Sequence, residues 1–355
     1  MKQSNRYAIW TPLFLFLIIL VPSSLSQTLH GAGSTFPYPL YSKWFESYRK
    51  LHPSVKIHYW PVGSDAGIED LIEGKVDFAA SDTAMSAEQL KMAKAKLGTD
   101  ILQIPAVLGA VVPIYKVDGV NSELKFTGAA LAGIYLGTIT MWDDPEIANA
   151  NPSITLPSEK IVVVHHSDPS DTTYQWTDFL SQVSPAWSAG PGKGLNVTWP
   201  VGLGAKGDDG VEDLVVGPVG YYGVADFVSG IRNSIGYVQL HYAIERRLPY
   251  GDVLSKSGGF VRATDSSVMA AAASSVPDSF RGSIENEPGE GTYPISSFTW
   301  LLIPAKMQDP VKTKAMADFV KWMLTDGQNS DDALHYVKLP AAIIDRAMTE
   351  IAKMR

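Results

Sequence analysis

Four short segments of this 355-residue chain carry small hydrogen-bonding residues where a helix is expected to begin. They span residues 31–37, 62–67, 167–173 and 202–210. The first turn of a helix presents backbone N–H groups that lack intrahelical partners, at the positive end of the helix dipole. Several such turns in one chain predict a protein that surrounds a tetrahedral oxyanion with hydrogen-bond donors.

The elements that must position these segments alternate along the chain. Short apolar strands are expected at 55–60, 76–80, 160–164 and 235–238, and helices at 66–73 and 173–183. This alternation indicates an α/β fold. Ligands of open α/β sheets lie beyond the C-terminal ends of the strands, which is where the polar turns fall.

Two longer apolar runs, at 104–117 and 294–303, are expected to pass from one lobe to another. A chain of 355 residues is longer than one simple core usually needs, which also favours two lobes. Two crossings make the first lobe discontinuous, because the C-terminal helices over 311–354 return to it. The expected division is lobe 1 over 27–103 and 291–355, and lobe 2 over 104–290.

The N-terminus has the pattern of a secretory signal peptide. Lys2 and Arg6 precede an apolar run over 9–21, and small residues follow at 22–26. We expect cleavage after Ser26 and a periplasmic protein. An uncleaved membrane anchor is the alternative, but the run is short for a membrane span.

The composition excludes several kinds of chemistry. The chain has no cysteine, so it has no disulfide, thiolate nucleophile or thiolate metal site. A net charge of −8 without a basic stripe argues against nucleic-acid binding. In an acidic chain, neutral dipoles inside a cleft must hold the anion. No cofactor is expected, and a strand places His165 and His166 on opposite faces, which disfavours a metal site.

A segment over 216–233 is rich in Gly and Val and reads as an insertion. We expect it to form a surface hairpin, since insertions usually lie in surface loops. The alternative is contact with a partner or with the edge of the cleft.

Longer motifs resemble the phosphate-binding protein family of bacterial high-affinity phosphate ABC importers. They lie at 31–39, 41–44, 76–82, 134–137, 142–144, 151–152, 199–210 and 235–238. The resemblance implies a type II-like periplasmic binding protein, with two α/β lobes that close about a hinge over one dehydrated phosphate. It also implies a monomeric, non-enzymatic receptor that delivers inorganic phosphate to the permease subunits of the transporter.

The resemblance implies which residues bind the ligand. The implied donors are Thr35, Phe36 and Ser64 in the first lobe and His166, Ser170, Asp171 and Thr172 in the second. Asp82 is implied as the carboxylate that accepts a proton from phosphate. Asp168 is implied as the acid that supports the residue at position 166.

The chain departs from the family pattern at two of these positions. His166 replaces an arginine, which would offer a permanent charge and a two-pronged fork. A neutral His166 donates one hydrogen bond, and in acid it adds a charge. Asp171 replaces a glycine; its backbone N–H remains available, and we expect its carboxylate to point away from the anion. Affinity and selectivity between phosphate and arsenate are left open.

Asp82 suggests how the site would distinguish phosphate from sulfate. Phosphate at neutral pH keeps a proton that a buried carboxylate can accept, whereas sulfate offers none. Arsenate has the same protonation and is not excluded by this logic. The simpler alternative is that Asp82 is an ordinary turn acid and that Thr35, Ser64 and Ser170 are helix N-caps.

Two alternative functions stay open at this point. One is a receptor for another oxyanion, such as arsenate or a phosphonate. The other is a secreted phosphatase on the same scaffold, in which Ser170 or Thr172 would act as a nucleophile beside His166.

Overall fold

The computed structural model describes residues 27–207, 223–274, 283–329 and 336–354. The expected signal peptide at 1–26 lies outside these residues, as do residues 208–210 of the fourth polar segment and 216–222 of the expected insertion. Within the described ranges, every helix is too short or too polar to span a bilayer.

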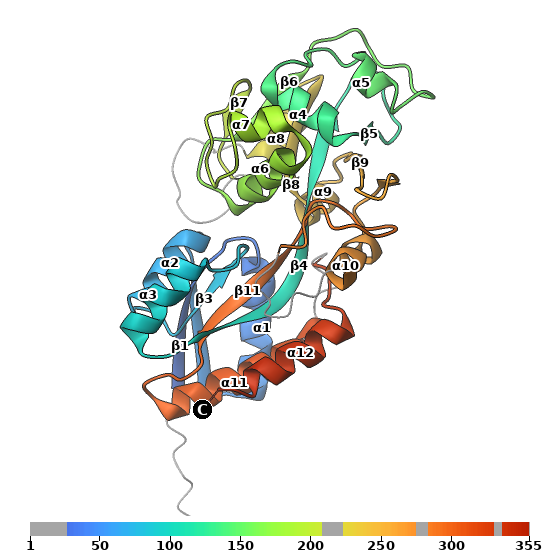
Figure 1. Cartoon of the computed structure of the whole chain (residues 1–355). Helices are drawn as coiled ribbons and strands as arrows, with labels where there is room; N and C mark the ends of the chain where they lie inside the picture. Colours follow the sequence, from blue (N-terminus) through green and yellow to red (C-terminus); the bar gives the residue numbers. More distant parts are fainter. Residues whose placement is uncertain (1–26, 208–222, 275–282, 330–335, 355) are drawn as a thin grey trace, which may run out of the picture.

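The molecule has two α/β halves (Figure 1). Strand β4 (Ile101–Lys116) runs from the first half into the second, and the chain returns through the segment that leads into β11 (Ser296–Pro304). Both long apolar runs were predicted to do this, and the two-lobed α/β fold is confirmed. The expected boundary at 103/104 falls inside β4, and the division of the chain into lobes stays a prediction.

One sheet of eight strands extends through both halves, in the order β2-β1-β3-β11-β4-β8-β6-β7. The remaining strands of this sheet are β1 (Gln27–Gly33), β2 (Val55–Pro61), β3 (Phe78–Ser81), β6 (Val162–His166), β7 (Leu203–Ala205) and β8 (Ser234–Gln239). Strands β1, β2 and β3 are parallel, as are β6, β7 and β8. Strand β4 is antiparallel to β11 over 101–110 and to β8 over 111–116, so it exchanges one partner for the other.

In the described part of the chain, five helices cover the strands of the first half. They are α1 (Tyr38–Leu51), α2 (Ser64–Ile72), α3 (Ala87–Leu97), α11 (Pro310–Leu324) and α12 (Ala341–Ile351). Helix α2 approaches β1 very closely, because a Cβ atom on Gly67 would lie only 2.3 Å from the Cα atom of Gly33. This contact places the first turn of α2 beside the end of β1.

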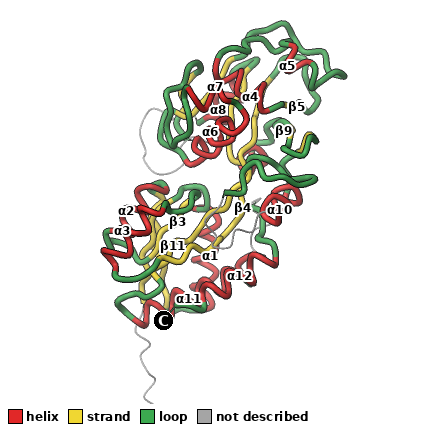
Figure 2. Tube along the Cα trace, in the orientation of Figure 1, coloured by secondary structure: helices red, strands yellow, loops and turns green. Residues whose placement is uncertain are grey.

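The other helices of the described chain lie in the second half and at its junction with the first; Figure 2 draws them in red. They are α4 (Gly128–Leu136), α5 (Pro145–Ala148), α6 (Asp171–Val183), α7 (Pro185–Ala189), α8 (Val224–Gly230), α9 (Leu240–Glu245) and α10 (Asp265–Ser274). Helix α6 packs on β8 through Trp176, whose ring stacks on Tyr237 at 5.0 Å. Tyr237 and Trp176 are both fully buried in this contact.

One local prediction is tested only in part. Residues 203–205 of the segment at 202–210 form strand β7, because this Gly-rich backbone pairs with β6, while residues 208–210 lie outside the described residues. The expected hairpin is wrong for its described part, which contains helix α8. Val224 and Val228, one helical turn apart, pack over Gly236 of β8, where an added Cβ would lie within 2.8 Å of both side chains.

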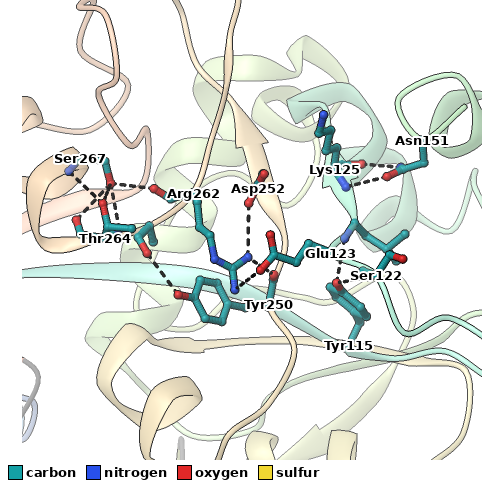
Figure 3. A network of polar contacts seen from close by, with 12 residues as sticks. Tyr115, Ser122, Glu123, Lys125, Asn151, Tyr250, Asp252, Arg262, Thr264 and Ser267 are labelled. Carbon is teal, nitrogen blue, oxygen red and sulfur yellow. Dashed lines mark hydrogen bonds and ion pairs between the residues drawn. The ribbon is translucent and has the colours of Figure 1, made fainter. Parts of the chain in front are cut away.

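A polar network surrounds a small second sheet in the second half (Figure 3). This sheet consists of β5 (Lys125–Phe126), β9 (Asp252–Leu254) and β10 (Phe260–Val261). Arg262 forms ion pairs with Glu123 at 3.0 Å and Asp252 at 3.4 Å, and its guanidinium lies 3.9 Å from the centre of the Tyr250 ring. The network holds the small sheet together.

Candidate anion-binding site between the two halves

Polar turns follow the C-terminal ends of strands in both halves. Residues 34–37 follow β1, Asp82 follows β3, and residues 167–170 follow β6. The sequence predicted this arrangement from the position of ligand sites in α/β sheets. Helix α2 begins after β2 and helix α6 begins after β6, as the polar segments indicated.

Asp82 is a buried carboxylate with a donor on each oxygen. Only 3% of the residue is exposed. Ser34 Oγ donates to Oδ2 at 2.8 Å, and Thr299 Oγ1 donates to Oδ1 at 2.6 Å. The Phe36 N–H donates to Ser34 Oγ at 3.2 Å, which links this predicted donor to the same cluster. These contacts fix the orientation of the Asp82 carboxylate.

Ser64 joins Asp82 to the other half of the molecule. It is the first residue of α2, and its hydroxyl accepts from the Asp82 N–H at 3.1 Å. The same hydroxyl donates to Asp171 Oδ2 at 2.8 Å. Asp171 is the first residue of α6 in the second half. A continuous chain of hydrogen bonds therefore runs from Phe36 through Ser34, Asp82 and Ser64 to Asp171.

The expectation that the Asp171 carboxylate points away from the site is wrong. Asp171 is only 8% exposed and bonds to Ser64, a predicted ligand donor. Its carboxylate is favoured there because it lies in the first turn of α6, where the helix dipole stabilises negative charge. The first turn of α2 supplies the hydroxyl donor.

The start of α6 brings Ser170 and Thr172 into the same region. Ser170 is the N-cap of α6, and its Oγ accepts from the Thr172 N–H at 3.2 Å. Gln239, the last residue of β8, donates to Thr172 Oγ1 at 3.3 Å. The simple N-cap interpretation therefore holds for Ser170.

The N-cap interpretation fails for the other two hydroxyl residues. Gly63 is the N-cap of α2, so Ser64 lies one position inside that helix, and Pro37 is the N-cap of α1. Thr35 lies in the turn before Pro37, with its side chain exposed and its carbonyl oxygen accepting from the Tyr38 N–H at 3.2 Å.

His166 is buried against Asp168 and Tyr237. The residue is 1% exposed, its Nδ1 lies 3.5 Å from Asp168 Oδ1, and its ring lies 5.4 Å from the Tyr237 ring. Asp168 also accepts from the Gly207 N–H at 3.0 Å. Burial alone would raise the pKa of Asp168, but the hydrogen bonds from His166 and Gly207 lower it overall. Asp168 thus contacts residue 166, as the sequence suggested.

His165 faces away from His166. Its ring stacks on Trp199 at 4.7 Å, and burial lowers its pKa. The two histidines therefore lie on opposite faces of β6. In the described part of the chain, no group of three His, Asp or Glu side chains is arranged to hold a metal ion.

A groove opens beside the site. Its volume is about 610 Å³, and its walls include Asp65, Thr83 and Glu88 from the first half with Tyr174 and Asn196 from the second. Asp65 and Thr83 directly follow Ser64 and Asp82 in the chain. The groove is therefore lined by the chain neighbours of two cluster residues, and its described walls include the carboxylates of Asp65 and Glu88.

Three residues of the cluster were missed. Ser34 lies in the first polar turn, next to the predicted Thr35, so the same signal could have found it. Gln239 directly follows the predicted strand at 235–238, which marks it as a strand-end residue. Thr299 lies in the middle of β11 and carries no turn signal, because its role depends on the pairing of β11 with β3.

The fold and the cluster of donors define a two-lobed solute-binding protein whose ligand site lies between its halves. A family model described as "PBP superfamily domain" matches residues 22–327. The phosphate-binding protein PstS of Pasteurella multocida is 37% identical over 92% of this chain and 90% of that protein. PstS of Methanocaldococcus jannaschii is 38% identical over 88% of this chain and 82% of that protein. The chain belongs to the PstS family of phosphate-binding proteins.

Solved structures agree with the fold. The structure of a human phosphate-binding apolipoprotein aligns with 90% of this chain and 93% of its own chain. The TM-score is 0.68 and the sequence identity is 19%. The structure of an ABC-type phosphate transport receptor from Vibrio cholerae aligns with 88% of this chain and with the whole of its own chain. The TM-score is 0.58 and the sequence identity is 16%.

Proposed function

We propose that this protein is a receptor that binds inorganic phosphate and delivers it to an ABC-type phosphate importer. The observation that carries the proposal is the chain of hydrogen bonds through Ser34, Asp82 and Ser64 at the strand ends. It places a buried acceptor among neutral donors, as a partly protonated oxyanion requires. The names of the curated relatives support phosphate as the ligand.

Asp82 gives the receptor its selectivity. The donors Ser34 and Thr299 hold its two oxygens in place, so the carboxylate presents an acceptor at a fixed position. A protonated phosphate oxygen can donate to it, whereas a sulfate oxygen meets it acceptor to acceptor. Phe36, Ser64, Ser170 and Thr172 supply donors to the other oxygens, with Thr35 at the exposed edge and His166 held by Asp168.

The receptor works in the periplasm as a monomer. The first 26 residues serve as a signal peptide that is removed after Ser26. The membrane permease subunits of the transporter receive the phosphate, and the lobes over 27–103 with 291–355 and over 104–290 close around it. Nucleic acid is not a partner of this acidic chain.

Equilibrium binding of labelled phosphate to residues 27–355 tests the proposal, with sulfate as the competitor. Phosphate should bind at one site, and equimolar sulfate should displace little of it. Strong displacement by equimolar sulfate would contradict the role of Asp82. The D82N variant should bind phosphate more weakly and discriminate less, because its amide can donate to either anion.

The protein carries out no hydrolysis in this proposal. Ser170 would be the nucleophile of a phosphatase, but its Oγ accepts the Thr172 N–H as a helix cap. A nucleophilic serine needs a base within hydrogen-bond reach. Incubation with a phosphomonoester should release no phosphate above background. Turnover that disappears in S170A would favour the phosphatase instead.

A further inference from the structure

Asp171 introduces a second carboxylate at the site. Its Oδ2 accepts from the Ser64 hydroxyl at 2.8 Å, and the same hydroxyl accepts from the Asp82 backbone. Both carboxylates are buried. Burial raises the pKa of Tyr59 well above its usual value, and the charges of Tyr41, Asp82 and Asp171 raise it further. Asp82 and Asp171 therefore act on the same buried phenol from the two halves of the molecule.

Two acceptors at one site change the number of protons that the ligand must bring. An ionised carboxylate accepts hydrogen bonds and donates none. The ion HPO₄²⁻ has one O–H group and satisfies one carboxylate, whereas H₂PO₄⁻ has two and satisfies both. We propose that Asp171 makes this site select the doubly protonated ion H₂PO₄⁻, so that one proton more enters the complex than Asp82 alone requires.

The surrounding charges favour the same ion. The titratable groups that the contacts relate to Asp171 are Asp82, through Ser64, and Tyr59. Asp168 and His166 stand three and five positions earlier in the chain, and Asp65 directly follows Ser64 in the first turn of α2. Among these groups the carboxylates outnumber His166, which is the one member of the set that can become positively charged. Repulsion between like charges at short range is therefore smaller for a monoanion than for a dianion.

The contact between Ser64 and Asp171 also competes with the ligand. While the Ser64 hydroxyl donates to Asp171, it is not available to phosphate. The apparent affinity is reduced by the fraction of molecules in which this contact is formed. Asp171 thus weakens binding of any oxyanion that cannot offer the carboxylate a proton in return.

Calorimetric titration of phosphate into wild type, D171G and D171N tests this inference, which rests on the proposed function. At about pH 8, both variants should bind phosphate about tenfold more tightly than wild type, the effect expected from one unsatisfied acceptor. The ratio between variant and wild type should fall toward one near pH 5.5, where H₂PO₄⁻ predominates. The free ligand ionises in the same way for every variant, so a ratio that changes with pH reports that wild type and variant bind different ions of phosphate.

Proton uptake gives a second readout. Titrations at about pH 8 in two buffers of different ionisation enthalpy give the number of protons bound with phosphate. Wild type should take up about one proton more than D171G or D171N. The D65N variant is the comparison, because it removes a nearby first-turn carboxylate that bonds neither Ser64 nor Asp82 in the described contacts. Its proton uptake should fall by less than that of D171N.

The outcomes separate the inference from the proposed function. Equal affinities and equal proton uptake in wild type, D171G and D171N would overturn the selection of H₂PO₄⁻ while leaving a phosphate receptor. No phosphate binding by any variant at either pH would overturn the proposed function. The D171N variant keeps a side chain at the start of α6, so a D171G protein that fails to fold leaves the test intact.

Discussion

Thr299 donates a 2.6 Å hydrogen bond to Asp82 from 217 positions further along the chain. The contact exists because β11 runs antiparallel to β3, with Trp300 of β11 opposite Ser81 of β3. The Ser34 hydroxyl donates to the other carboxylate oxygen of Asp82. The acceptor at the centre of the site is therefore oriented by an early and a late segment of the chain.

The first prediction concerns this donor. T299V keeps the β-branched shape but leaves one oxygen of Asp82 without its hydroxyl donor. We expect phosphate affinity to fall about tenfold, since hydrogen bonds to charged groups contribute about 1.5–3 kcal/mol. Equilibrium dialysis with labelled phosphate measures the effect, and the discrimination against sulfate should weaken with it.

T313V serves as the control for that variant. Thr313 is also buried and hydrogen-bonded, with Oγ1 donating to Asp309 O at 3.1 Å, but it lies on α11. T313V should lose stability and keep its phosphate affinity. If T299V and T313V bind phosphate equally well, Thr299 has no role in the site.

The second prediction concerns His166. H166R supplies a permanent charge and a forked donor at a position where wild type has a buried imidazole beside Asp168. Phosphate affinity should rise, by about tenfold for one added charge-assisted hydrogen bond, and depend less on pH. Titrations between mild acid and mild base measure both quantities. No change in either quantity would place residue 166 outside the ligand's direct contacts.

The third prediction concerns the approach of α2 to β1. G67A places a methyl group 2.3 Å from Gly33 Cα and 2.7 Å from the Ala32 carbonyl oxygen, so helix and strand must separate. Overpacking of this kind costs about 1–3 kcal/mol. Because Ser64 begins the same helix, phosphate affinity should fall as well. Urea unfolding and phosphate titration together measure the change.

A matched control is available in α8. A Cβ atom on Gly230 would meet no other atom within 4 Å, so G230A adds the same methyl group into open space. Its stability should stay within about 0.5 kcal/mol of wild type, as for most surface changes. If G67A and G230A lose the same free energy of unfolding, the close approach of α2 to β1 does not explain the effect of G67A.

The fourth prediction uses the buried carboxyl of Glu285. Burial raises its pKa well above the usual range, and the charge of Asp178 adds to the effect. A raised folded-state pKa gives a contribution that is fully present below the unfolded value of about 4.3 and is lost as pH rises toward the folded value. In E285Q the side chain cannot ionise, so this loss of stability at higher pH does not occur.

E285Q should therefore equal wild type near pH 4 and exceed its free energy of unfolding near pH 8, by an amount that grows as the pH rises toward the folded-state pKa. Urea unfolding at several pH values measures the difference. The exposed Glu290 provides the control, since E290Q should track wild type throughout. Parallel profiles for E285Q and wild type would contradict a buried, proton-holding carboxyl at position 285.

Local features of the sequence predicted the strand-end turns. Gly63 and Ser64 mark the start of α2, and Ser170 marks the start of α6, because helix starts depend on a few neighbouring residues. The crossing through β4 was predictable because a run this apolar must be buried along its length. These features place most of the site without any knowledge of tertiary contacts.

The direction of side chains was not predictable in the same way. The Asp171 carboxylate bonds to Ser64 because the other half of the molecule supplies the donor. Thr299 contributes because one strand pairs with another far along the chain. Residues 203–205 form a strand for the same reason, since a Gly-rich segment takes the conformation of the neighbour with which it pairs.

Strand β4 exchanges its partner between Ala110, which lies opposite Ser296, and Val111, which lies opposite Gln239. Both residues are fully buried. A rotation of one half against the other would have to twist this strand inside the core, because the two halves share one sheet and do not slide over a separate interface. Any opening of the molecule would therefore have to bend or twist β4 between these two residues.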